Sequence, residues 1–128
     1  MIKKLVLVLL ILFPMVGRAQ NNTTRFFVAY DHEELTVAGT AVGFTSSKVT
    51  STSNTINSAE LVTFSVTCAS GTTCPVRFLV DTGTPTSSIG QLVDTGSFVA
   101  VYGHVNIVNF RAIRTTSTSA TLDAVYYR

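Results

Sequence analysis

Apolar and polar positions alternate along much of the chain, as they do in strands that bury one face. In Leu61–Thr67 the side chains of Val62, Phe64 and Val66 fall on one side. Val76–Asp81 repeats this alternation, whereas Ser97–Tyr102 is apolar on both sides, as in a buried central strand. We predict further strands at Arg25–Tyr30, Glu34–Val37, Ala41–Phe44, Lys48–Thr52, Val105–Ile113 and Leu122–Tyr127.

Helical periodicity is not evident in any stretch after residue 20. The same region is rich in Val, Thr and Ser, and turn residues separate the predicted strands at regular intervals. This pattern predicts an all-β fold: a single small antiparallel β-sandwich or jelly-roll-like domain of about eight strands. Residues 45–58 are low in complexity and are interpreted as an exposed strand or long loop within that domain.

The N-terminus has the pattern of a secretory signal peptide. Lys3 and Lys4 precede an apolar run from Leu5 to Val16, and Gly17 and Ala19 supply small residues before a cleavage site. The run is shorter than the roughly 20 apolar residues that a membrane-spanning helix needs. We therefore predict a signal peptide at 1–19 and one β-sandwich domain at 20–128, secreted or periplasmic, with no membrane span after cleavage.

Cleavage would change the electrostatic character of the chain. The full sequence has nine basic and seven acidic residues, a formal charge of +2. Removing the three basic residues of the signal peptide leaves six against seven acids, a formal charge of −1. Since phosphate binding needs a surplus of Lys and Arg, we expect no nucleic-acid partner.

Two cysteines, Cys68 and Cys74, flank the turn-prone segment Ala-Ser-Gly-Thr-Thr. Because exported proteins meet an oxidising compartment, we predict a disulfide between them. The alternative is a pair of free thiols at the end of a hairpin. A metal site needs more ligands than this pair offers.

Two short motifs resemble the aspartic-protease signature: Val80–Thr84, which contains Asp81, and Val93–Ser97, which contains Asp94. That chemistry needs two carboxylates that share a proton. The motifs are only 13 residues apart, too close for each to belong to its own lobe. The simpler interpretation is turn chemistry, in which Asp bonds its own backbone two residues on and Gly supplies a positive φ. We therefore assign Asp81, Gly83 and Pro85 to a structural turn and keep catalysis by Asp81 or Asp94 as a remote alternative.

A second polar cluster, Asp31-His32-Glu33-Glu34, could in principle bind a metal. Consecutive residues of a strand point to opposite faces, so a solvated turn is the favoured interpretation. Motifs for nucleophilic catalysis, zinc binding and phosphate binding are not found in the sequence. We expect no catalytic residue, no metal site and no cofactor.

The C-terminal part of the chain has a pattern of strand and turn residues that resembles that of other proteins. It comprises Pro75-Val76-Arg77-Phe78, then Asp81, Gly83, Pro85-Thr86, Gly90 and Gly96, then Phe110-Arg111-Ala112-Ile113-Arg114, Ala120-Thr121-Leu122 and Tyr126-Tyr127. With Ala41–Thr45 included, residues 35–128 resemble a group of small, uncharacterised all-β proteins of tailed-phage structural gene clusters and viral metagenomes. The resemblance implies structural or interface roles for Arg77 and Arg111 on neighbouring strands, and no catalytic residue. The signal peptide and the cysteine pair depart from that pattern, and both fit export.

These observations support two main hypotheses of function. The first is a non-enzymatic structural or assembly protein, virion-associated or surface-exposed, whose partner is protein through self-assembly or a structural neighbour. The second is a secreted binding module that recognises a carbohydrate or a surface receptor through loops at one end of the sandwich.

Overall fold

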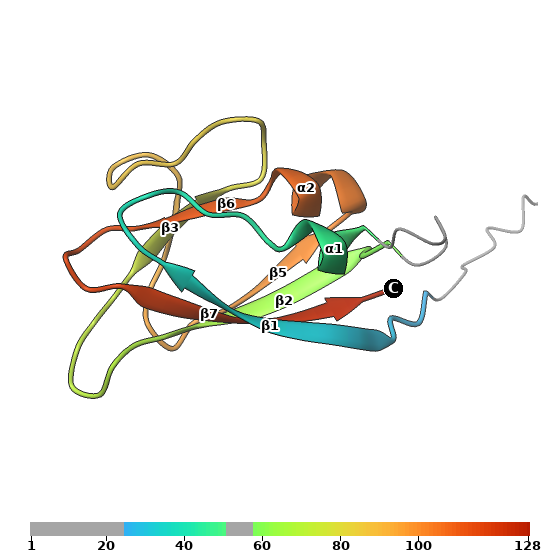
Figure 1. Cartoon of the computed structure of the whole chain (residues 1–128), viewed down its shortest axis with the longest axis horizontal. Helices are drawn as coiled ribbons and strands as arrows, with labels where there is room; N and C mark the ends of the chain where they lie inside the picture. Colours follow the sequence, from blue (N-terminus) through green and yellow to red (C-terminus); the bar gives the residue numbers. More distant parts are fainter. Residues whose placement is uncertain (1–24, 51–57) are drawn as a thin grey trace, which may run out of the picture.

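Two antiparallel sheets make up most of the domain (Figure 1). The computed structural model describes residues 25–50 and 58–128, so the signal peptide predicted at 1–19 lies outside the described residues. The larger sheet has the order β1-β7-β2-β5, and the smaller sheet has the order β4-β3-β6. The strands are β1 (Ala29–Val37), β2 (Leu61–Thr67), β3 (Val76–Leu79), β4 (Gln91–Val93), β5 (Phe98–Tyr102), β6 (Arg111–Arg114) and β7 (Ala120–Tyr127).

The small all-β sandwich predicted from the sequence is confirmed. Strand β7 lies in the middle of the larger sheet and pairs with β1 on one side and β2 on the other. Its burial alternates along its whole length: Leu122, Ala124 and Tyr126 are buried, and the residues between them are partly exposed. This two-residue period is what places one face of the sheet against the core.

An aromatic cluster fills the space between the sheets, with Phe110 at its centre. The Phe110 ring stacks on Phe44, with centroids 4.0 Å apart. It also contacts Phe64 at 5.3 Å and Phe78 at 5.5 Å, and all four rings are buried. Since Phe64 belongs to the larger sheet and Phe78 to the smaller, Phe110 joins the two sheets through ring packing.

Two short helices lie in stretches where the sequence shows no helical periodicity: α1 (Ser46–Val49) and α2 (His104–Asn109). The strand predicted at Val105–Ile113 is therefore wrong over its first half, and only β6 remains of it. Helix α2 begins after Gly103, whose φ of 86° lies in the left-handed region that glycine tolerates. In the described part of the chain, no helix is long and apolar enough to cross a membrane.

Other strand boundaries also differ from the sequence predictions. The predicted strands Arg25–Tyr30 and Glu34–Val37 overlap a single strand, β1, which begins only at Ala29. Ala41–Phe44 contributes only an isolated bridge. Helix α1 replaces the start of the strand predicted at Lys48–Thr52, whose remainder reaches beyond residue 50 into the undescribed segment. The three-residue strand β4 was not predicted, because so short a run shows no alternation.

Candidate functional site

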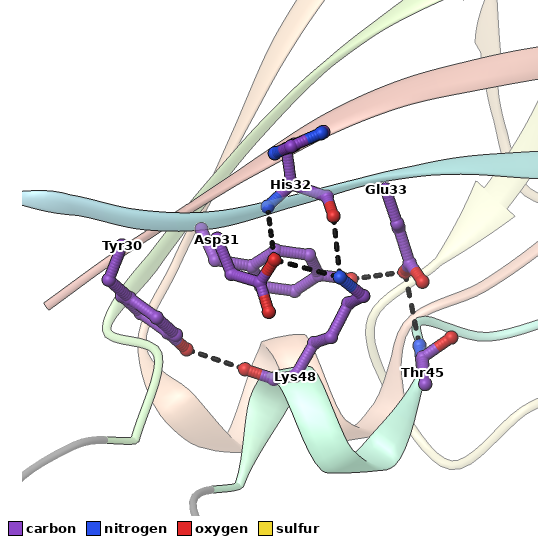
Figure 2. A network of polar contacts seen from close by, with 7 residues as sticks. Tyr30, Asp31, His32, Glu33, Thr45 and Lys48 are labelled. Atoms are coloured by element: carbon purple, nitrogen blue, oxygen red, sulfur yellow. Dashed lines mark hydrogen bonds and ion pairs between the residues drawn. The ribbon is translucent and has the colours of Figure 1, made fainter.

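A polar network joins the start of β1 to helix α1 (Figure 2). The ammonium of Lys48 donates to Asp31 Oδ1 at 2.8 Å and to the carbonyl oxygen of His32 at 2.6 Å. In return, the hydroxyl of Tyr30 donates to the carbonyl oxygen of Lys48 at 2.6 Å. These contacts attach α1 to the edge of the larger sheet.

Glu33 forms the second half of this network. Its Oε1 accepts a hydrogen bond from the backbone N–H of Thr45 at 3.1 Å and a second one from the hydroxyl of Tyr126. Burial, followed by the hydrogen bond to the Glu33 carboxylate, raises the pKa of Tyr126 far above its ordinary value. The tyrosine therefore stays protonated and keeps donating to Glu33, so the network is suited to hold structure.

The four residues Asp31 to Glu34 do not form the solvated turn predicted from the sequence. They lie within β1, where Asp31 and Glu33 are partly buried while His32 and Glu34 are exposed on the other face. Because consecutive side chains of a strand point to opposite faces, the four groups do not converge on one ion. Across the described ranges 25–50 and 58–128, no group of three potential metal ligands is close enough to hold a metal.

The Asp31 contacts lead to a prediction about pH. Hydrogen bonds from the Lys48 ammonium and from the His32 N–H hold the pKa of Asp31 below its ordinary value of 3.8. A lowered pKa in the folded state stabilises the fold above the unfolded pKa, and this stabilisation is lost as the pH falls through the folded pKa. We expect the urea midpoint of the wild type to fall more steeply below about pH 4 than that of Asp31→Asn.

Glu34→Gln, on the exposed face of the same strand, is the matched control and should follow the wild-type curve. Parallel curves for the wild type and Asp31→Asn would contradict a stabilising role for the ion pair.

An open hollow of about 350 Å³ lies beside the two helices. Its lining combines apolar side chains with one cation, Arg111. The guanidinium of Arg111 donates to the carbonyl oxygen of Phe110 at 2.6 Å and to that of Val108 at 3.1 Å, which positions it at the rim. The hollow can accept a small ligand, but no carboxylate, histidine or cysteine is among the described residues that line it. They are Gly43, Phe44, Ser46, Val49, Thr50, Val108 and Arg111.

The two Asp-Thr-Gly motifs are separated by the pairing of β3 with β4. Val76 pairs with Val93 at one end of this ladder, so Asp94 follows that end while Asp81 lies beyond the other. Asp94 is level with Pro75, and the chain from Pro75 to the end of β3 at Leu79 spans roughly 13 Å at about 3.3 Å per residue. Within one chain, these two carboxylates therefore do not share a proton.

The turn at Asp81 has the local hydrogen bond typical of such motifs. The N–H of Gly83 donates to Asp81 Oδ1 at 2.7 Å. The positive φ expected at Gly83 is wrong, however; it occurs at Gly96 of the second motif, with a φ of 82°. Pro85 is fully buried.

Arg77 and Arg111 lie on neighbouring strands, since Arg77 of β3 pairs with Ile113 of β6 and Leu79 pairs with Arg111. The guanidinium of Arg77 donates to the carbonyl oxygens of Ser87 at 3.1 Å and Gly90 at 2.7 Å. Arg77 therefore holds the loop that follows the Asp81 turn.

Cys68 and Cys74 form a disulfide, with Cα atoms 6.0 Å apart. Cys74 is fully buried, and its N–H donates to the hydroxyl of Thr95 at 2.9 Å. Thr95 belongs to the turn between β4 and β5. The bonded pair thus connects the β2–β3 loop to the neighbouring turn.

The sequence prediction missed an exposed surface on β5, the edge strand opposite β1 in the larger sheet. Ser97–Tyr102 was expected to be a buried central strand, but β5 lies at the sheet edge. Phe98 is 69% exposed and Tyr102 is 60% exposed, and the ring of Phe27 contacts Tyr102 with centroids 6.2 Å apart. We call Phe27, Phe98, Ala100 and Tyr102 the aromatic strip. The signal for it was the alternation of Phe98, Ala100 and Tyr102 with two valines.

Comparison with known proteins adds no relative: no family model, no curated protein and no solved structure matches this chain. The described residues provide three candidate sites: a structural polar network, a small hollow beside Arg111 and the aromatic strip.

Proposed function

We propose that this protein is a non-enzymatic structural or assembly protein that acts outside the cytoplasm and binds other protein surfaces. The observation that carries the proposal is the aromatic strip. Its three rings expose on the order of 300 Å² of apolar surface, if an aromatic side chain contributes roughly 200 Å². This area is about that of the largest apolar patch on a typical monomeric protein, and such patches are often functional.

The proposed location rests on the cysteines. A disulfide persists in oxidising compartments and is rare in the cytosol, so the bonded Cys68–Cys74 pair supports export. The resemblance of residues 35–128 to phage-related all-β proteins supports a place in a virion or another surface-exposed assembly.

The test is the molar mass of the full chain, expressed in an export-competent host and measured by size-exclusion chromatography with light scattering. We expect a discrete oligomer or larger particle, and a Phe98→Ser/Tyr102→Ser variant should have a lower mass because it loses apolar contact area. Val105→Ser is the control, since Val105 is 70% exposed but lies on α2. A monomer at every concentration would contradict self-assembly.

A second candidate is a secreted binding module for a carbohydrate or a surface receptor. The hollow beside Arg111 favours it, because about 350 Å³ falls within the range of small-molecule sites. A monomeric wild type in the mass measurement would make this candidate the stronger one.

A further inference from the structure

Among the strands that the structure describes, β5 pairs only with β2, so its outer edge has no partner strand. The N–H of Gly103 donates to the carbonyl oxygen of Glu60 at 2.8 Å, and that of Val66 donates to Ser97 at 3.2 Å. These two bonds show which residues in and next to β5 direct their backbone N–H and C=O toward β2 in the antiparallel ladder: Ser97, Gly103 and every second residue between them. The other residues of β5 therefore point their backbone N–H and C=O away from β2. These residues are Phe98, Ala100 and Tyr102.

Few interactions occupy this edge in the described part of the chain. Strand β5 has no neighbour on its outer side, and the carbonyl oxygen of Tyr102 accepts from Asn106 Nδ2 at 2.9 Å. A carbonyl oxygen has two lone pairs, so Tyr102 can still accept a second bond. An open hollow of about 270 Å³ runs beside the strand and gives space for the side chains of a further strand.

The other three sheet edges are protected against pairing. The edge of β1 carries Asp31 and Glu33 and is bound by Lys48, and β4 is only three residues long. The edge of β6 is covered by Val42, whose backbone exchanges two hydrogen bonds with Ala112, at 2.9 and 2.8 Å. Charges, short strands and covering segments are the means by which proteins block edge pairing. The edge of β5 has no charged residue.

The sequence of β5 is nearly palindromic: Phe-Val-Ala-Val-Tyr. If a second copy pairs antiparallel about a two-fold axis at Ala100, each Phe98 lies opposite Tyr102 of the second copy. The valines then face valines, and no like charges meet. Aromatic pairs directly across two strands stabilise a sheet, and the small Ala100 side chains leave room at the axis.

We propose that two copies of this chain pair edge to edge through β5, joining their larger sheets into one continuous sheet. This inference rests on the proposed assembly function and names the surface and the partner. The contact is isologous, because the same strand serves both copies. Its aromatic area alone is small compared with the roughly 800 Å² per partner of a stable complex, so the backbone bonds must contribute and the dimer dissociates on dilution.

Ala100→Pro tests the proposal on the full chain. Proline removes the outward N–H of residue 100 but no hydrogen bond to β2, and proline is tolerated on an edge strand. We expect the loss of self-association in sedimentation or light scattering over about 1–100 μM, a range chosen for a weak interface. A wild-type circular dichroism spectrum would show that the variant folds.

Ala100→Lys is the second variant, since it places two ammonium groups opposite each other at the axis and should also give single chains. Thr36→Lys makes the same charge change on β1, at the opposite edge of the sheet, and should associate like the wild type. If the wild type associates and both Ala100 variants do so equally, the edge contact is refuted while the assembly function stands. A wild type that is monomeric throughout refutes both.

Discussion

Replacing Phe110 by alanine is expected to lower the free energy of unfolding by about 3–5 kcal/mol, the usual cost of a large-to-small change at a buried aromatic. The Phe110 ring is fully buried and contacts Phe44, Phe64 and Phe78. These come from the segment before α1, from β2 and from β3. A small domain has about 5–15 kcal/mol in total, so much of its stability would be lost. Urea unfolding followed by circular dichroism measures the change.

The matched control for this substitution is Val105→Ala. Val105 belongs to α2, the helix that ends directly before Phe110, but its side chain is 70% exposed. Its truncation should change the free energy of unfolding by no more than about 0.5 kcal/mol, as at most surface positions. Equal urea midpoints for the two variants would show that Phe110 does not join the sheets.

The second large effect is expected from the disulfide. Cys68 and Cys74 are six residues apart, and for so short a loop the restriction of the unfolded chain amounts to about 2 kcal/mol. A Cys68→Ala/Cys74→Ala variant should therefore unfold at a lower urea concentration than the oxidised wild type, while its circular dichroism spectrum remains that of a β protein.

Reductant supplies an independent measurement of the same bond. Dithiothreitol should shift the wild-type midpoint toward that of the double variant and leave the double variant unchanged. If the wild-type midpoint does not respond to reductant, the bond contributes nothing measurable to stability.

The fold class could be predicted from the sequence, but the two helices and several strand boundaries could not. Leu61–Thr67 and Leu122–Tyr127 were predictable because their alternation is set by burial against one core. Helix α2 was not, since its β-branched residues favour a strand and six residues are too few for a helical period. Its conformation is decided by tertiary contacts, among them the burial of Ile107.

The candidate sites were harder to predict than the strands. The disulfide and the Asp81 turn depend on residues close in sequence, and local spacing was enough to suggest them. The contact between Glu33 and Tyr126 joins residues 93 positions apart, which no local pattern reveals. The aromatic strip depends on β5 lying at an edge, and strand order is a property of the whole fold.

The central position of β7 determines when the larger sheet can form. Because β7 lies between β1 and β2, these two strands have no partner in common until β7 has been synthesised. The sheet closes by bringing residues near 30 together with residues near 125, a long loop closure that slows folding. In a growing chain β2 and β5 can pair before β7 has been synthesised, whereas β1 joins the larger sheet only afterwards, through β7.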